Sequence, residues 1–269
     1  MKISQKLIVV TGAGGGIGSE LVLQLLQRGA RVAAIDLREE SLAGLQSRAA
    51  ELGANLSTHA CDIGDRSAVE ALPAAITQAH DSEIDGLINC AGIIQPFVKV
   101  NDLEYGAIDR VMRVNFYGTL HMTKTFLPLL LSRTEAHIVN VSSMGGFLPV
   151  PGQSVYGASK AAVKLLTEGL YAELLNTSVK VSVVFPGATK TEITKNSQVT
   201  TPGGDDAGSQ SDYKMLPASD AAKIILDGME KNKPQIFTGN DSKIMNRLYR
   251  LAPTYATKLI AKQMKSLLK

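Results

Sequence analysis

The chain has 269 residues, of which 45% are hydrophobic and 20% charged, so it can bury a large core and is not a disordered protein. Its formal net charge of +3 excludes a strong general attraction to nucleic acid, and no such partner is expected. Its two cysteines, Cys61 and Cys90, are too few for a disulfide framework, and its four histidines lack ligand spacing, so no metal is predicted. No apolar run suits a signal peptide or approaches the roughly 20 residues of a membrane span, so we expect a cytoplasmic protein.

Short apolar runs alternate with longer stretches of helical period along most of the chain. The runs lie at 7–10, 32–35, 87–88, 138–141, 181–185 and 236–237, with a weaker candidate at 56–63. Apolar runs without alternation predict parallel strands that are covered on both faces. Between the first two runs, Ile17, Leu21 and Leu25 repeat every four residues, as in a helix. The pattern predicts an α/β fold, a doubly wound parallel sheet (Rossmann-like), in one domain over residues 1–240.

One internal segment breaks this alternation. Residues 189–217 are polar and rich in Gly, Ser and Thr, with few apolar residues. Loops of this length in a compact domain are usually functional lids or disordered. Because the segment follows the sixth strand in the chain, at the edge where ligands enter such sheets, a substrate lid is one hypothesis and a disordered loop the other.

The C-terminal tail, residues 241–269, is basic and amphipathic. It holds one acidic residue and seven basic ones, which leaves the rest of the chain slightly acidic. Helical spacing places Ile244, Leu248, Leu251 and Tyr255 on one side. Such a helical tail can lie on an anionic membrane, or pack its apolar side on the domain or on a partner subunit. Packing is the favoured interpretation.

The stretch TGAGGGIG follows the first predicted strand and leads into the first predicted helix. In that context a tight turn lets a pyrophosphate approach backbone N–H groups at the positive end of a helix, whereas glycines alone would indicate only a flexible turn. The spacing is T-G-x-x-x-G-x-G rather than the general G-x-G-x-x-G. The residues predicted to cradle the dinucleotide are Gly12, Gly16, Ile17 and Gly18.

An acidic residue, Asp36, ends the second predicted strand about twenty residues after the glycine turn. A carboxylate there accepts hydrogen bonds from both ribose hydroxyls and repels a 2′-phosphate, so NAD is favoured over NADP. Arg38 is the opposing signal, because it could neutralise such a phosphate; a solvated surface charge is its simpler role. Five further residues at the ends of the third and fourth strands are expected to contact the cofactor: Asp62, Ile63, Asn89, Ala91 and Gly92.

The motifs TGAGGGIG, NCAG, VNVSS, YGASK and PGATKT, in this order and separation, resemble the short-chain dehydrogenase/reductase family from about residue 5 to 240. The resemblance implies that Tyr156 donates or accepts the reacting proton and that Lys160 activates it and binds the ribose. It implies that Ser143, thirteen residues before the tyrosine, binds the substrate oxygen, and that Asn115 anchors a proton-relay water. A homodimer or homotetramer is likewise implied. The segment implied to hold the nicotinamide carboxamide comprises Pro186, Gly187, Thr189 and Thr191.

The chemistry of an alcohol oxidation supports these roles for Tyr156 and Lys160, which would share one face of a helix. The hydroxyl proton must leave as the hydride is transferred, so a base is needed near neutral pH. Tyrosine ionises at a pKa of ~10, and lowering it by three units requires roughly 4 kcal/mol. A lysine ammonium nearby, together with the positive charge of oxidised nicotinamide, can supply most of that. Ser143 would donate a hydrogen bond to the oxygen in the carbonyl-reducing direction.

Apolar residues near the predicted site suggest a substrate with hydrophobic bulk, a ketone or secondary alcohol. They follow the serine or the fourth strand: Met144, Phe147, Leu148, Ile94 and Phe97. A regulatory protein that binds a dinucleotide without turnover is the alternative from another functional class, but it would not require Ser143, Tyr156 and Lys160 together. An epimerase or dehydratase of the same superfamily is disfavoured by the short C-terminal part of the chain.

Overall fold

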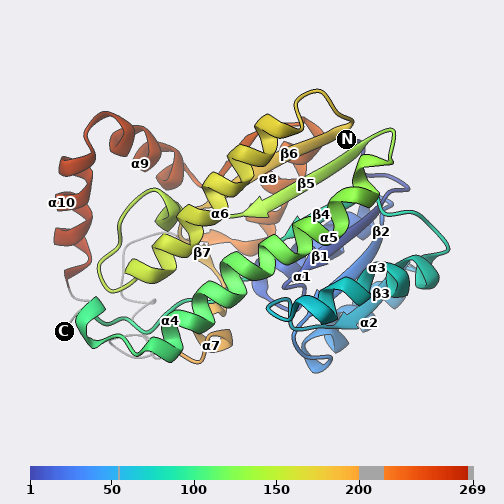
Figure 1. Cartoon of the computed structure of the whole chain (residues 1–269), viewed down its shortest axis with the longest axis horizontal. Helices are drawn as coiled ribbons and strands as arrows, with labels where there is room; N and C mark the ends of the chain where they lie inside the picture. Colours follow the sequence, from blue (N-terminus) through green and yellow to red (C-terminus); the bar gives the residue numbers. More distant parts are fainter. Residues whose placement is uncertain (54, 200–214, 266–269) are drawn as a thin grey trace.

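The computed structural model describes residues 1–53, 55–199 and 215–265, and its centre is a seven-stranded parallel sheet (Figure 1). The strand order is β3-β2-β1-β4-β5-β6-β9. The strands span β1 Leu7–Thr11, β2 Arg31–Asp36, β3 Leu56–Ala60, β4 Gly86–Asn89, β5 Ala136–Val141, β6 Val179–Pro186 and β9 Gln235–Thr238. Each predicted apolar run lies in one of these strands, and the weaker candidate supplies β3. The predicted doubly wound parallel sheet is confirmed.

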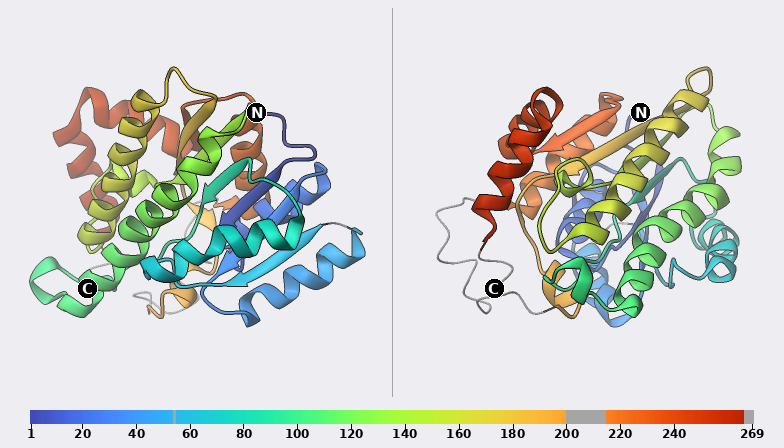
Figure 2. Two further views of the ribbon diagram at one scale, coloured as in Figure 1. Left: turned by 45° about the vertical axis from the view of Figure 1, so that its right-hand side comes forward. Right: turned by 60° about the vertical axis from the view of Figure 1, so that its left-hand side comes forward.

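Helices cover both faces of the sheet (Figure 2). The helices that cover it are α1 Gly16–Gln27, α2 Glu40–Glu51, α3 Arg66–His80, α5 Thr119–Leu131, α6 Ser154–Glu173 and α8 Ala218–Glu230. Helices α1, α2 and α8 share one core with Ile8 and Val10, whereas α3, α5 and α6 share the other with Leu7 and Val9. Successive strand residues point to opposite faces, so a continuous apolar run is needed to fill both cores.

A π-helical turn at Arg113–Gly118 joins α4 Tyr105–Met112 to α5 without a break. Two 3-10 turns, η1 Val100–Asp102 and η3 Met144–Gly146, follow β4 and β5. π-turns inside helices are rare and often lie at functional sites. The turn at Arg113–Gly118 is therefore expected to lie close to the functional site.

The predicted lid segment is not structureless where the structure describes it. Its two ends pair as the short parallel strands β7 Thr189–Lys190 and β8 Leu216–Pro217, and α7 Ile193–Asn196 lies between them in the chain. The central part of the hypothesis, residues 200–214, lies outside the described residues. The pairing holds the two ends of the segment together beside the end of β6.

The C-terminal tail forms α9 Asn240–Leu251 and α10 Pro253–Gln263 and packs on the domain (Figure 1). Leu148, which follows β5, forms a small third core with Ala256 and Ile260, and Leu248 packs against it. This packing agrees with the interpretation favoured from the sequence; residues 266–269 lie outside the described part. None of the described helices is long and apolar enough to cross a membrane.

The predicted apolar side of the tail packs only in part on the domain. Ile244, Leu251 and Tyr255, which the sequence places on that side, are 62%, 86% and 60% exposed in the single chain. The backbone leaves the helical region at Ala252, with φ −144° and ψ 69°, and Pro253 begins a new helix. Proline disfavours the α conformation in the residue before it. One helical period therefore cannot continue through residue 255, and the packed residues are distributed over two helices.

A buried histidine in the central sheet makes the stability of the fold pH-dependent. His137 of β5 is fully buried with its Nε2 atom 2.8 Å from Ser182 Oγ, and burial lowers the pKa of His137 to about 3. The unfolded chain binds this proton near pH 6.5, so the free energy of unfolding falls as the pH drops below 6.5. Between pH 6.5 and 4.5 this histidine should cost about 2 kcal/mol, and His137→Gln should remove that part of the slope. Urea denaturation of both proteins at the two pH values measures it; parallel pH dependence would contradict the assignment.

Candidate active site

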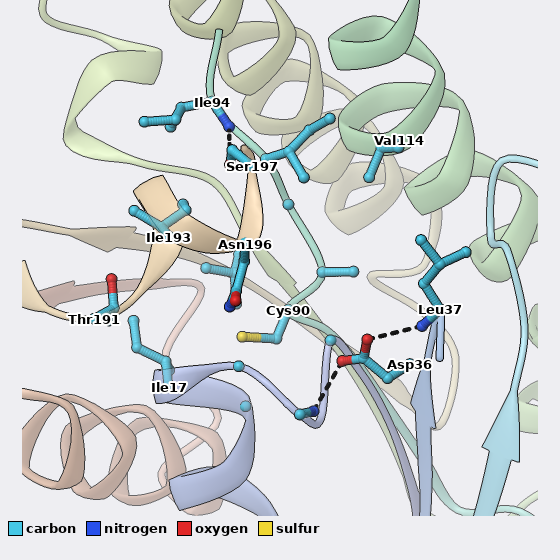
Figure 3. A pocket seen from close by; sticks show the side chains of 18 of the residues that line it. Ile17, Asp36, Leu37, Cys90, Ile94, Val114, Thr191, Ile193, Asn196 and Ser197 are labelled. Carbon is cyan, nitrogen blue, oxygen red and sulfur yellow. Dashed lines mark hydrogen bonds between the residues drawn. The ribbon is translucent and has the colours of Figure 1, made fainter. Parts of the chain in front are cut away.

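A cavity of about 520 Å³ opens at the carboxyl ends of the parallel strands. Figure 3 shows Ile17, Asp36 and Cys90 there, from the segments after β1, at the end of β2 and after β4, beside Ile193 and Asn196 of α7. Open α/β sheets bind their ligands at this edge, because the loops after neighbouring strands meet there. The cavity therefore collects nearly all residues that the sequence singled out, and it is the candidate active site.

The glycines of the first turn are required by close approaches of backbone. Gly12 has φ +67°, and a Cβ atom there would lie 2.7 Å from the Cα atom of Ala91. A Cβ atom at Gly18 would lie 2.0 Å from the carbonyl oxygen of Gly12, and one at Gly16 would lie 3.1 Å from Thr191 Cβ. The turn thus packs directly against the β4 loop, its own helix and the segment after β6. Because the N-cap Gly15 has no side chain, the positive end of α1 can receive an anion.

Asp36 lies beside this turn at the end of β2. Its Oδ2 atom accepts a hydrogen bond from Gly14 N at 2.8 Å, and Oδ1 accepts one from Leu37 N at 2.8 Å (Figure 3). Two backbone donors hold the carboxylate in place, and each oxygen keeps a second lone pair for a ligand. Arg38 is exposed and also lines the cavity. Asp36, which would repel the 2′-phosphate of NADP, and Arg38, which could neutralise it, therefore both line the same cavity.

The remaining strand-end predictions separate into two groups. Asp62, Ile63, Ala91 and Gly92 line the cavity, and Asp62 Oδ2 accepts a hydrogen bond from Arg113 Nη1 at 2.7 Å. Asn89 does not itself line the cavity, so its expected contact with the cofactor stays a prediction. It is 2% exposed and its Nδ2 atom donates to Asn140 Oδ1 at 2.8 Å. As the last residue of β4 it joins this strand to β5.

The predicted reacting groups converge on the cavity. Ser143, Tyr156 and Lys160 all line it, the serine from the turn after β5 and the other two from α6. Lys160 is 3% exposed and its Nζ atom donates to the carbonyl oxygen of Val141 at 3.0 Å. Burial lowers the pKa of Lys160 to about 8, so its ammonium remains charged at neutral pH. Ser143 Oγ accepts a hydrogen bond from Gly145 N at 3.0 Å, and this contact does not use its own proton.

Burial is the main influence of the chain itself on the acidity of Tyr156. It raises the pKa of Tyr156, because a buried phenolate loses its hydration, and a hydrogen bond with Ser143 opposes that rise. The lowering expected from the sequence was assigned to Lys160 together with the positive charge of oxidised nicotinamide, and it stays a prediction.

Asn115 lies in the helix where the resemblance implied it, within the π-helical turn. It is fully buried in the π-helical turn, and its side chain brackets Ile93 by accepting from its N–H at 2.9 Å and donating to its carbonyl at 3.0 Å. Its Nδ2 atom also donates to Ser159 Oγ at 2.9 Å, and that hydroxyl donates to the carbonyl of Tyr156 at 2.7 Å. Asn115 does not itself line the cavity, so its side chain joins the β4 loop to α6. Its role with a relay water stays a prediction.

The segment after β6 brings all four of its predicted residues to the cavity: Pro186, Gly187, Thr189 and Thr191. The first turn of α9 holds this segment in place. Asp241 Oδ2 accepts a hydrogen bond from Ala188 N at 2.8 Å, and Ser242 Oγ donates to the carbonyl of Phe185 at 2.8 Å. The tail therefore supports the predicted nicotinamide segment, although the sequence-based domain boundary placed residues 1–240 and the tail in separate units.

The sequence model of the family described as short chain dehydrogenase matches residues 6–201. The chain belongs to this family. Among curated relatives, SadH of Mycobacterium tuberculosis is 35% identical over 263 residues, which cover 95% of this chain and 94% of SadH. A Staphylococcus aureus protein named as an uncharacterized oxidoreductase is 31% identical over 231 residues, covering 86% of this chain and 94% of its own. The chain is therefore an oxidoreductase of the short-chain dehydrogenase family.

Solved structures of short-chain dehydrogenases have the same fold. One from Burkholderia phymatum, in complex with NAD, has a TM-score of 0.83 and 26% identity, covering 93% of this chain and 96% of its own. Another from Burkholderia cenocepacia, in complex with NADP, has a TM-score of 0.78 and 27% identity, covering 98% and 99%. These similarities extend well past residue 201, so the fold match includes β9 and the helices that follow.

On the substrate side, this short-chain dehydrogenase differs from the sequence-based expectation. Ile94 lines the cavity as expected, but Met144, Phe147 and Leu148 pack towards α9 and α10, and Phe97 is also outside the lining. Four of the five residues that suggested a substrate with hydrophobic bulk therefore do not line the cavity. Lining residues that were not predicted include Cys90 after β4, Arg110 of α4 and Val114 of the π-helical turn. Four others lie in the segment 189–217 that the sequence singled out as a possible lid, although none was named singly: Ile193, Asn196, Ser197 and Gln198. Only their proximity in the sequence to motif residues could have indicated them.

Proposed function

We propose that this oxidoreductase interconverts a secondary alcohol and a ketone with a nicotinamide dinucleotide, and that Tyr156 is its general acid/base. The observation that carries the proposal is that Ser143, Tyr156 and Lys160 line one cavity together with the glycine turn and Asp36. Structures similar to this chain were solved with NAD and with NADP, which supports a cofactor of this class. A protein that only bound the dinucleotide would have no need of the three reactive groups.

The cavity fits such a cofactor in its own geometry. The glycine turn has no room for side chains and offers the positive end of α1 to a pyrophosphate. Asp36 would accept hydrogen bonds from the ribose, and the segment from Pro186 to Thr191 would hold the nicotinamide. When bound, the nicotinamide supplies the hydride acceptor or donor. The chain's own residues bind the dinucleotide, orient the substrate and move the proton.

The proton transfer is assigned to Tyr156. In alcohol oxidation its phenolate takes the hydroxyl proton as the carbon–hydrogen bond breaks, and in ketone reduction the phenol returns a proton to the oxygen. Lys160, which is charged at neutral pH, favours the phenolate. Ser143 donates a hydrogen bond to the substrate oxygen, which stabilises negative charge as it develops there. In the oxidation direction the positive charge of oxidised nicotinamide would act with Lys160 against the rise in the pKa of Tyr156 that burial causes.

NAD is the favoured cofactor. The Asp36 carboxylate is fixed by the N–H groups of Gly14 and Leu37 and faces the cavity. A 2′-phosphate placed against it would be repelled at short range. Arg38 is exposed, so its attraction for such a phosphate is screened by solvent.

A panel of secondary alcohols and ketones, read at the nicotinamide absorbance with NAD and NADP in parallel, tests this function. We expect turnover on at least one substrate pair, with a higher kcat/KM for NAD. Calorimetric titration of both dinucleotides accompanies the assay. Binding of dinucleotide without turnover of any compound would oppose the catalytic proposal and favour a regulatory protein, and binding of neither would remove the cofactor assignment.

A further inference from the structure

A buried glutamine from the β4 loop caps the helix that carries Tyr156. Gln95 is fully buried, and its Oε1 atom accepts hydrogen bonds from Val155 N at 2.8 Å and from Tyr156 N at 2.9 Å. Its Nε2 atom donates to the carbonyl of Gly152 at 3.0 Å. The backbone carbonyl of Gln95 also accepts a hydrogen bond from Gln153 Nε2 at 2.8 Å. Gln95 is thereby hydrogen-bonded to four of the five residues from 152 to 156 at the start of α6, all except Ser154.

This long-range cap replaces one that the local sequence lacks. The first amides of a helix have no partners within it, and a side chain at the N-cap usually accepts their hydrogen bonds. The N-cap of α6 is Gln153, which makes no such bond. Without Gln95, the N–H groups of Val155 and Tyr156 would lose these acceptors at a largely buried helix end, and unsatisfied donors of this kind are costly.

The loop that carries Gln95 is fixed from two further directions. Asn115 holds both backbone polar groups of Ile93, and Ser197 Oγ accepts the N–H of Ile94 at 2.9 Å (Figure 3). Three consecutive residues therefore connect the π-helical turn, the segment after α7 and the start of α6. Because one of the capped amides belongs to Tyr156 itself, the position of the phenol depends on this loop.

We propose that Gln95 is a positioning residue, which holds the backbone of Tyr156 in register with Ser143 and the cavity. The inference rests on the proposed function, since it assigns Gln95 a role in placing the general acid/base. A displaced proton carrier reacts much more slowly even when it is chemically intact, because the reacting atoms must start close to their final geometry. Gln95 itself is expected to touch neither substrate nor cofactor, because it does not line the cavity.

Three variants separate positioning from general stability. Gln95→Met keeps the volume of the side chain and removes both acceptors and the donor. Gln95→Glu keeps an acceptor for the two amides, and its second oxygen can replace the donor to the Gly152 carbonyl when the carboxyl group is protonated. Gln153→Met is the matched control, because it removes another buried amide side chain from the same place but leaves the amides of α6 capped.

Amide hydrogen exchange at Val155 and Tyr156, kcat, KM and the dinucleotide Kd are measured for each variant. For Gln95→Met we expect exchange at both amides to rise about tenfold or more, and kcat to fall about ten- to hundredfold with the Kd nearly unchanged. Gln95→Glu should retain the protection and recover most of the kcat. Gln153→Met should raise the exchange at these two amides much less than Gln95→Met does, and it should lower kcat much less.

Two results would overturn the inference: unchanged exchange at both amides in Gln95→Met, or a loss of kcat no larger than in Gln153→Met. Should Gln95→Met fail to fold, Gln95→Glu decides, because a kcat loss in it despite protected amides would contradict positioning by the cap. Absence of turnover in the unaltered chain would instead contradict the proposed function, and the exchange rates would still show whether Gln95 holds the helix.

Discussion

Replacing Tyr156 with phenylalanine is expected to lower kcat about a thousandfold while the dinucleotide still binds. The substitution keeps the aromatic ring, which lines the cavity, and removes only the oxygen that carries the proton. Positioned acid/base groups contribute roughly 10²- to 10⁴-fold to rates, so the loss should lie within that range. Steady-state kinetics with NAD and the best substrate of the panel measure kcat, and calorimetry measures the dinucleotide Kd.

The matched control for this substitution is Tyr171→Phe. Tyr171 lies on the same helix, α6, but is 40% exposed and outside the cavity lining. Its replacement should leave kcat and Kd within about twofold, as for most exposed side chains. A Tyr156→Phe protein that keeps more than about a tenth of the kcat would remove Tyr156 from the role of general acid/base.

The cofactor preference should respond almost as strongly to Asp36→Asn. This change removes the negative charge at the end of β2 and keeps one oxygen, which can accept from one of the two backbone donors, Gly14 or Leu37. A hydrogen bond to a charged group is worth ~1.5–3 kcal/mol, so NAD should bind about ten- to hundredfold more weakly. Relief of the repulsion should improve NADP at the same time. The ratio of kcat/KM for NAD over NADP should therefore fall about a hundredfold.

Asp62→Asn is the control for the effect of charge. Asp62 also lines the cavity, but its carboxylate is paired with Arg113. Its replacement should weaken both dinucleotides to a similar degree and leave their ratio nearly constant. Equal changes for NAD and NADP in Asp36→Asn would show that Asp36 does not select the cofactor.

Short-range patterns in the sequence were sufficient to predict the fold and much of the site. The spacing of Tyr156 and Lys160 places them on one side of a single helix, and the Gly12 and Gly18 positions are required within one turn. Continuous apolar runs predicted a sheet covered on both faces because the strand geometry is local. Asp36 followed from its distance to the glycine turn. Except for Asp36, each of these predictions depends on residues that are neighbours in one element or turn.

Contacts between distant segments were beyond such patterns. The sequence around Gln95 does not indicate that this residue caps a helix about sixty residues later. Nor does the sequence around Asp241 indicate that its carboxylate holds the segment after β6. Met144 and Leu148 were assigned to the pocket because they follow the serine, but the position of α9 and α10 directs them elsewhere. The pKa of Tyr156 depends on the burial of the whole cavity wall, which the sequence does not specify.

The central claim is that positive charge in the cavity makes the phenol of Tyr156 acidic enough to act. Ultraviolet difference titration of the unaltered protein against Tyr156→Phe isolates the ionisation of this one tyrosine, with and without NAD⁺. Bound NAD⁺ should lower the pH at which Tyr156 ionises, and Lys160→Met should raise it. A midpoint that neither NAD⁺ nor the loss of the lysine moves would contradict the account.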